Sequence, residues 1–196
     1  MKRIFFGATL PDITKVQIAS IQRELGPHLP GARFEGKDKL HITLQFIGDF
    51  NPEKIPELHS SFVKEKERVP FKSSVTAITG ISVFPNEKVR RGIWLDCKDD
   101  GTLEKLSELI KSVTVQYGII PEARAFKPHI TVARLKEHRQ GGVEEIDLQK
   151  FTSEGKLSFE RFFPKSVALF ESVLSPDRSG SKYTILNEYP LKQSEI

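Results

Sequence analysis

The sequence predicts an α+β fold: a duplicated, bilobal unit with mostly antiparallel sheets around a central cleft. Stretches with strand-like and helix-like periodicity intermix along the 196 residues. Several strand-like stretches follow one another with only short turns between them, which favours antiparallel hairpins. The tetrapeptide His-Ile-Thr-Leu at residue 41 returns 88 residues later as His-Ile-Thr-Val, which indicates an internal repeat. We expect residues 1–196 to form one bilobal domain.

Hydrophobic periodicity and turn residues give the expected order of elements. Asp12 and Asp100 stand where two helices should begin, with side chains suited to capping. We expect helices at residues 12–25, 52–66, 102–117 and 143–149. We expect strands at residues 2–8, 39–47, 70–84 with a break near Gly80, 91–97, 128–134, 153–163, 165–174 and 182–190.

The offset of 88 residues relates more than the two tetrapeptides. It superimposes residues 4–7 on residues 92–95, and both segments look like buried strands. It also superimposes the first expected helix on the third, and Phe71 on Phe159, with strand-like runs after each phenylalanine. A pseudo-two-fold axis between the halves would make the two His-x-Thr strands equivalent partners around one cleft.

Each tetrapeptide carries a histidine and a threonine two positions apart in an apolar, β-branched run. Residues i and i+2 of a strand point to the same face, so each copy offers one imidazole beside one hydroxyl. One histidine could take a proton while the other gives one, and the hydroxyls could hold an oxyanion. The candidate residues for this chemistry are His41, Thr43, His129 and Thr131.

Composition narrows the classes of protein. The chain has no apolar run near 18–20 residues and no signal-peptide pattern at its start, so we expect a cytoplasmic protein that does not enter a membrane. The net charge of +4 permits a polyanionic substrate without requiring one. Three basic residues lie close to the second motif: Arg124, Lys127 and Arg134. The single Cys97 reads as a small buried residue and not as a nucleophile.

A metal site is disfavoured by the same sequence. The two motif histidines could ligate zinc, but no acidic third ligand recurs with them, and the paired threonines would have no role. We find no Gly-rich phosphate loop and no Cys/His cluster with the spacing of metal ligands. We therefore expect neither a metal nor another cofactor.

The two motifs also carry a family resemblance. The segment His41-Ile-Thr-Leu-Gln-Phe-Ile-Gly48 resembles the first signature of the 2H phosphoesterases. The segment Arg124-Ala-Phe-Lys-Pro-His-Ile-Thr-Val-Ala-Arg134 is similar to the second signature in one branch, the RNA 2′,3′-cyclic phosphodiesterases, first named 2′–5′ RNA ligases. Gln45 and Val132 depart from the residues usual at their positions.

The resemblance implies a bilobal fold with a deep cleft, and hydrolysis of a 2′,3′-cyclic phosphate at an RNA 3′ end to a 2′-phosphate. By position it makes His41 the proton donor to the leaving 3′ oxygen and His129 the base that activates water. Thr43 and Thr131 would hold phosphate oxygens, and Arg134 would add charge at the cleft rim. Run backwards, the same groups could form a 2′–5′ bond between RNA ends. We expect the enzyme to act as a monomer.

Phe126, beside the second motif, is a candidate for stacking on a terminal base, because aromatic faces commonly hold single-stranded RNA ends. A core position next to the motif strand is the alternative. Two other functions also stay open. One is a related enzyme acting on a small cyclic phosphate, such as an ADP-ribose cyclic phosphate. The other is a module that binds RNA 3′ ends without turning them over.

Overall fold

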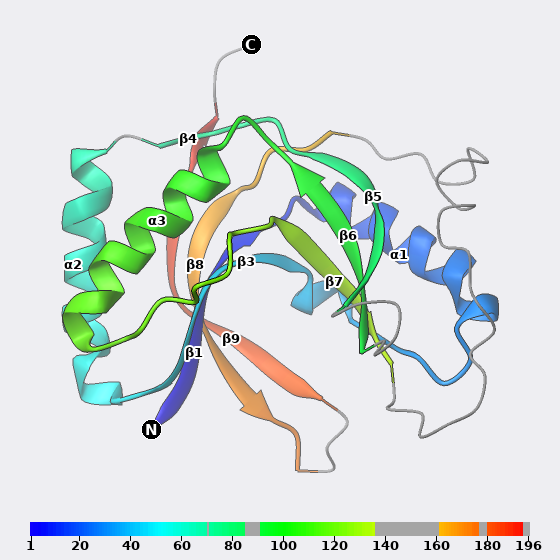
Figure 1. The fold of residues 1–196 in the computed structure, drawn as a ribbon, viewed down its shortest axis with the longest axis horizontal. Helices are drawn as coiled ribbons and strands as arrows, with labels where there is room; N and C mark the ends of the chain where they lie inside the picture. Colours follow the sequence, from blue (N-terminus) through cyan, green and yellow to red (C-terminus); the bar gives the residue numbers. More distant parts are fainter. Residues whose placement is uncertain (70, 85–90, 136–160, 177–179, 194–196) are drawn as a thin grey trace.

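Eight strands form one sheet in the residues that the computed structural model describes, namely 1–69, 71–84, 91–135, 161–176 and 180–193 (Figure 1). The order along the sheet is β5-β6-β7-β3-β1-β8-β9, and the short β2 pairs with β7. These pairings are antiparallel. Two short strands, β4 and β10, form a separate parallel pair. The predicted α+β class with mostly antiparallel strands is confirmed.

The strands of the large sheet are β1 (Lys2–Thr9), β2 (Arg33–Phe34), β3 (His41–Phe50), β5 (Ala77–Phe84), β6 (Gly92–Lys98), β7 (His129–Arg134), β8 (Ser166–Leu174) and β9 (Ser181–Pro190). The parallel pair consists of β4 (Lys72–Ser73) and β10 (Lys192–Gln193). The α-helices are α1 (Asp12–Leu25), α2 (Ile55–Arg68) and α3 (Thr102–Thr114), and single 3₁₀ turns cover Gly26–His28, Lys37–Lys39, Pro52–Lys54 and Val115–Tyr117.

The strand order reflects the repeat in the sequence. The sheet has β7 and β3 at its centre, followed outward by β6 and β5 on one side and by β1 and β8 on the other. Strand β7 corresponds to β3, β6 to β1, and β5 to β8. The residues of each corresponding pair differ by an offset near 88. At the centre, Ile42 of β3 pairs with Ile130 of β7, its own equivalent in the repeat. The pseudo-two-fold axis therefore passes between these two isoleucines.

Each half of the chain anchors the motif strand of the other half through a helix. Helix α3, from the second half, packs against β3, and α1, from the first half, contacts β7 (Figure 1). The buried hydroxyl of Ser107 in α3 donates to the carbonyl oxygen of Leu44 at 2.7 Å. The amide of Gln22 in α1 donates to the carbonyl oxygen of Val132 at 3.0 Å. Leu44 and Val132 are equivalent residues, and each directly follows a motif threonine.

Most of the predicted elements are present within a few residues of their expected bounds. The expected strand 70–84 is divided earlier than expected, into β4 and β5, and near Gly80 the structure has a register shift inside β5. Helix 143–149 and most of strand 153–163 lie outside the described residues. One expectation is wrong: Asp12 does not cap α1, because it is already the first helical residue and Pro11 occupies the cap position. Asp100 does accept a hydrogen bond from the backbone nitrogen of Thr102 at the start of α3.

The core lies between the sheet and the helices. The apolar face of α3 is fully buried through Leu106, Ile110 and Val113, as expected from its periodicity.

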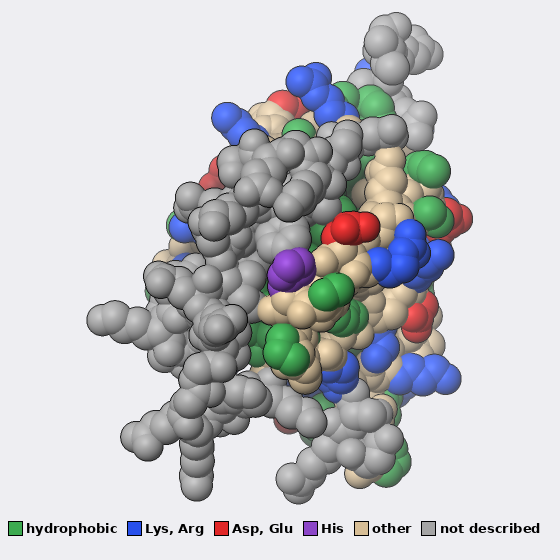
Figure 2. All heavy atoms as spheres, turned by 90° about the vertical axis from the view of Figure 1, so that its right-hand side faces the viewer, with side chains coloured by type: hydrophobic (Ala, Val, Ile, Leu, Met, Phe, Trp, Pro, Cys, Tyr) green, Lys and Arg blue, Asp and Glu red, His purple; other side chains and the backbone are tan. Residues whose placement is uncertain are grey.

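Cys97 is also buried, and burial raises the pKa of its thiol to about 12, so it stays an unreactive thiol. In the described part of the chain, no helix is both long and apolar enough to span a membrane. Acidic and basic side chains are interspersed on the face shown in Figure 2.

Candidate active site

The two motif strands lie side by side at the centre of the sheet, and their pairing assembles the site. Because side chains alternate along a strand, the residues flanking Ile42 and Ile130 project from the opposite face to the isoleucines. Antiparallel pairing then sets each histidine opposite the threonine of the other motif. The four side chains gathered on one face in this way are those predicted from the sequence: His41, Thr43, His129 and Thr131.

Backbone carbonyl groups fix the orientation of both imidazoles. Nδ1 of His41 lies 2.6 Å from the carbonyl oxygen of Lys39, and Nδ1 of His129 lies 2.7 Å from that of Lys127. A carbonyl oxygen only accepts, so each Nδ1 carries a hydrogen. The nitrogen available for chemistry is therefore Nε2 in both rings. Nε2 of His41 lies 3.0 Å from Oγ1 of Thr43, whose hydroxyl donates to it when the ring is neutral.

Aromatic rings from three strands surround His41. The ring centroids of Phe5, Tyr183 and Phe170 lie 4.9, 5.4 and 5.5 Å from that of His41. Burial lowers the pKa of His41 from 6.5 to about 4; the hydrogen bond to the Lys39 carbonyl opposes this shift without cancelling it, and the charge of His129 adds to it. Without a bound anion, His41 is therefore neutral near pH 7.

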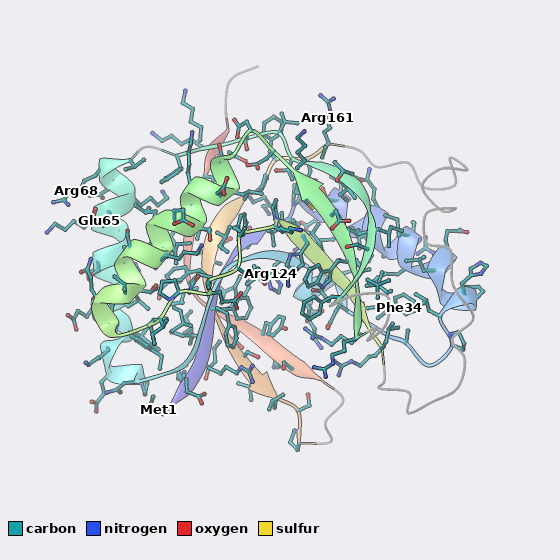
Figure 3. All side chains as sticks on the ribbon, viewed as in Figure 1. Met1, Phe34, Glu65, Arg68, Arg124 and Arg161 are labelled. Atoms are coloured by element: carbon teal, nitrogen blue, oxygen red, sulfur yellow. The ribbon has the colours of Figure 1, made fainter. Side chains whose placement is uncertain are left out.

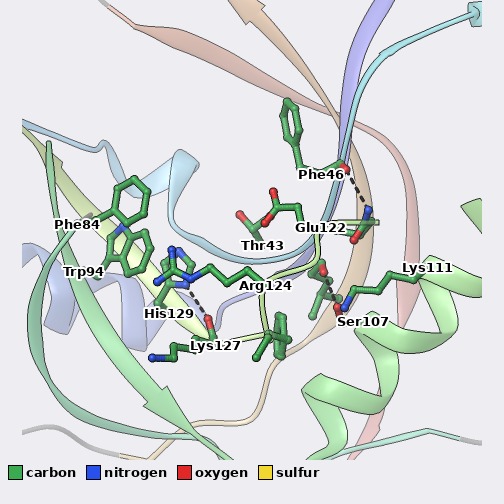
Figure 4. Close-up of a pocket in the computed structure, with 14 residues that line it drawn as sticks. Thr43, Phe46, Phe84, Trp94, Ser107, Lys111, Glu122, Arg124, Lys127 and His129 are labelled. Atoms are coloured by element: carbon green, nitrogen blue, oxygen red, sulfur yellow. Dashed lines mark hydrogen bonds between the residues drawn. The ribbon is translucent and has the colours of Figure 1, made fainter. Parts of the chain in front are cut away.

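A stack of two rings supports His129. The indole of Trp94 lies 3.6 Å from the imidazole, centroid to centroid, at an interplanar angle of 20°. Phe84 stacks on the far side of Trp94 at 4.4 Å, so the three rings form one column (Figure 4). Burial lowers the pKa of His129 below 6.5, and the neighbouring positive charge of Arg124 acts in the same direction.

Two pockets meet at the four motif side chains. One, of about 260 Å³, contains His129 and the Phe84–Trp94 pair (Figure 4); we call it the His129 pocket. The other, of about 400 Å³, contains His41, Thr131 and Arg134; we call it the His41 pocket. Thr43 and Phe46 line both pockets. A group bound beside Thr43 would thus have one histidine on each side.

Arg134 lines the His41 pocket, beside the motif residues, as the sequence suggested, but its ion-pair partner Glu35 could not be predicted. Its Nε donates to the carboxylate of Glu35 at 2.7 Å, and this carboxylate is 8% exposed. Tyr183 also interacts with the Arg134 guanidinium. Glu35 follows the two-residue strand β2, which is too short to give a periodic signal, so only the fold brings it into the site.

Sequence reasoning also missed Phe46, which is 39% exposed and lines both pockets. In the pairing of β1 with β3 the register shifts between Phe6 and Gly7, so that Leu44 has no partner residue. Such an irregularity interrupts the alternation of side chains and redirects those beyond it. This accounts for a phenylalanine three positions after Thr43 that reaches the same cavities.

The position of Phe126, the predicted stacking residue, is compatible both with a role in the core and with stacking on a base. It is partly buried and packs against the main apolar core, yet it also lines the His129 pocket. Phe84 and Trp94 line the same pocket as an already stacked pair. Arg124 and Lys127 line it as well, whereas Arg134 belongs to the His41 pocket.

Over the residues that the structure describes, no group of three or more His, Cys, Asp or Glu side chains has the arrangement of a metal site.

Comparison with known proteins agrees with this geometry. A family model described as "LigT like Phosphoesterase" matches residues 9–94 and 96–178. Two archaeal proteins named RNA 2′,3′-cyclic phosphodiesterase are similar. The one from Archaeoglobus fulgidus is 29% identical over 89% of this chain and 93% of its own length. The one from Methanothermobacter thermautotrophicus is 31% identical over 70% of this chain and 73% of its own length.

Two solved structures show the same fold. A protein of Thermus thermophilus superimposes with a TM-score of 0.75 at 24% identity, over 98% of this chain and 100% of its own. Escherichia coli LigT, solved with 3′-AMP, superimposes with a TM-score of 0.70 at 21% identity, over 98% of this chain and 99% of its own. The match to the family model confirms the resemblance of the two His-x-Thr motifs to the 2H phosphoesterases, and the chain belongs to the family of LigT-like phosphoesterases.

Proposed function

We propose that this protein hydrolyses the 2′,3′-cyclic phosphate at the 3′ end of RNA and leaves a 2′-phosphate, without a metal ion. One observation carries the proposal: two imidazoles and two hydroxyls share one face of the β3–β7 pair, between two pockets. A strained cyclic diester needs an acid, a base and stabilisation of its oxygens, and this set supplies all three. The relatives named RNA 2′,3′-cyclic phosphodiesterase support the choice of substrate.

In the proposed reaction Nε2 of His129 takes a proton from water as the water oxygen attacks phosphorus. The bond from phosphorus to the 3′ oxygen breaks, and the proton on Nε2 of His41 moves to that oxygen. The 2′ oxygen keeps the phosphate. Thr43 and Thr131 donate to the non-bridging oxygens, and Arg134 adds positive charge beside them. Reversed, the same steps would join a cyclic phosphate end to a 5′-hydroxyl end as a 2′–5′ bond.

The direct test uses an oligoribonucleotide that ends in a 2′,3′-cyclic phosphate, incubated with the protein in EDTA. We expect full turnover, and a product that resists a 3′-specific phosphatase and shows a 2′-phosphate by phosphorus NMR. Activity that EDTA abolishes and zinc or manganese restores would contradict the metal-free mechanism. A 3′-phosphate product would contradict the proposed orientation of the ribose. Running an ADP-ribose cyclic phosphate in parallel separates an RNA enzyme from one for small substrates.

The lowered histidine pKa values predict an acid-shifted pH optimum. The reaction needs His41 protonated and His129 neutral, so the rate falls where both are protonated and where both are neutral. Because burial lowers the pKa of His41 more strongly than that of His129, this is the less populated of the two singly protonated forms of the free enzyme. For the free enzyme these limits follow a pKa of about 4 for His41 and one below 6.5 for His129. Because both pKa values are lowered, we expect kcat/KM, which reports the free enzyme, to peak on the acid side of pH 6.5. A maximum of kcat/KM above about pH 7 would contradict the prediction.

A bound phosphate should move this optimum. Its negative charge favours the protonated form of each imidazole, so it raises both pKa values. The profile of kcat, which reports the complex, should accordingly peak at a higher pH than that of kcat/KM. Measuring both constants across the pH range with one substrate tests both statements.

A further inference from the structure

The two pockets of the site differ in the chemistry of their walls. Among the residues that the structure describes, the lining of the His41 pocket has four basic side chains and a single acidic one; the basic ones are Arg3, Arg33, Lys39 and Arg134. The described lining of the His129 pocket contains the stacked pair of Phe84 and Trp94, together with three basic side chains and one acidic one, Glu122. The first resembles a site for an anion and the second a site for a flat ring.

The ion pairs sharpen this difference. In the His41 pocket, the single carboxylate of Glu35 is already engaged by Arg134 at 2.7 Å. The described lining of this pocket contains no second carboxylate that would offset the charge of Arg3 and Lys39. In the His129 pocket, Lys111 is paired with Glu108 at 2.7 Å, and Glu122 lines the same pocket as Arg124 and Lys127. Among the described lining residues, the excess of positive over negative charge is thus larger on the His41 side than on the His129 side.

The stereochemistry of the proposed reaction points the same way. Water attacks from the His129 side, so the leaving 3′ oxygen must face His41 for an in-line displacement. That oxygen is attached to C3′, and the ribose continues from C3′ through C4′ to C5′. The base is attached to C1′, next to C2′, at the other end of the sugar. The 5′ side of the terminal nucleotide therefore points toward the His41 pocket, and its base points toward the His129 pocket.

We infer that the His41 pocket is a second phosphate site, which binds the phosphate on the 5′ side of the terminal nucleotide. In RNA this group is the phosphodiester that links the last two nucleotides. The inference rests on the proposed function, and it states which way the RNA lies: chain toward Arg3 and Lys39, last base toward Phe84 and Trp94. A phosphate in this pocket distinguishes a nucleotide that belongs to a chain from a free nucleoside cyclic phosphate.

Two arginines in similar surroundings allow a matched test. The guanidinium of Arg3 lies over the ring of Phe46, 4.9 Å from its centroid, and lines the His41 pocket. That of Arg124 lies over the ring of Phe84 at 5.8 Å and lines the His129 pocket. Figure 3 labels Arg124 near the middle of the molecule and Arg68 on the outer helix α2, so Arg68→Gln serves as a remote control.

The probes are adenosine 2′,3′-cyclic phosphate and the same compound with a 5′-phosphate. In the unchanged protein we expect the 5′-phosphate to raise kcat/KM by about three- to fivefold, the upper range for an exposed ion pair, and the gain to shrink with added salt. Arg3→Gln should reduce the gain to about twofold or less, whereas Arg124→Gln should affect both compounds alike. Arg68→Gln should leave both rates unchanged. Circular dichroism and Tm confirm that each variant is folded.

The outcomes separate the inference from the proposed function. If the unchanged protein opens both compounds equally well, or if Arg124→Gln and not Arg3→Gln removes the gain, the inference is overturned while the hydrolase activity stands. If neither compound is opened, the oligoribonucleotide test described above decides the proposed function, and calorimetric titration with adenosine 2′-phosphate and adenosine 2′,5′-bisphosphate decides the phosphate site. Tighter binding of the bisphosphate that Arg3→Gln removes supports the phosphate site. Equal binding of the two overturns it.

Discussion

Replacement of His41 or of His129 by alanine is expected to lower the turnover of an RNA 2′,3′-cyclic end by about 10²–10⁴-fold, the usual contribution of a positioned acid or base. In both imidazoles Nε2 is the nitrogen available for chemistry, because backbone carbonyls hold their Nδ1 hydrogens. Each variant thus removes the one nitrogen that can exchange a proton with substrate or water. Steady-state rates on the cyclic-ended oligonucleotide measure the loss.

Two further variants make this result interpretable. Alanine at position 41 leaves a gap among three rings, so His41→Gln, which keeps most of the volume but cannot carry the proton, checks that the loss is chemical. His59→Ala is the matched control. His59 lies on α2, forms a hydrogen bond with the hydroxyl of Tyr189, and lines neither pocket. The double variant of His41 and His129 should lose about as much as either single one, since the pair acts as a unit. A single variant that keeps nearly full activity would refute the paired role.

Valine at Thr43 or Thr131 is expected to lower kcat by about ten- to a thousandfold, because each change removes one donor to the phosphate oxygens in the transition state. Valine keeps the shape and the strand preference of threonine. Thr43→Val should have a second effect, because its hydroxyl also donates to Nε2 of His41 at 3.0 Å. The pH profile should therefore move in Thr43→Val more than in Thr131→Val.

The control for both changes is Thr184→Val, at an exposed position of β9 that lines neither pocket, and it should leave kcat unchanged. Single-turnover measurements separate binding from chemistry. If both motif variants bind the cyclic end more weakly but open it at an unchanged kcat, the hydroxyls serve in ground-state binding and not in the transition state.

The four central side chains could be predicted because their placement depends on short-range rules. Alternation puts His41 and Thr43 on one face of a strand, and the repeat extends the same statement to the second motif. Symmetry then leaves few ways to join two such strands, and pairing at Ile42 and Ile130 is the one that keeps the halves equivalent. The expected arrangement around one cleft needed no long-range information beyond the repeat.

The surroundings of the histidines could not be predicted because each depends on contacts between distant segments. Three strands from both ends of the chain bring Phe5, Phe170 and Tyr183 to His41. Glu35 reaches Arg134 from a two-residue strand, across 99 positions of sequence. The identities of the side chains alone do not predict such contacts between residues that are distant in the sequence. The depressed pKa values follow from this burial, so they too were beyond the sequence.

The crossed anchoring of the helices has an evolutionary consequence. A chain half as long would carry one motif histidine, one motif threonine, and a helix whose anchoring carbonyl belongs to another copy. Such an ancestor could complete the site only as a homodimer, with each copy lending its helix to its twin. Fusion in tandem would then release the two histidines from identical environments, and they now differ: three rings surround His41, while Trp94 stacks on His129. Two identical subunits cannot fix in their sequence which histidine is the acid and which is the base, whereas a single fused chain can.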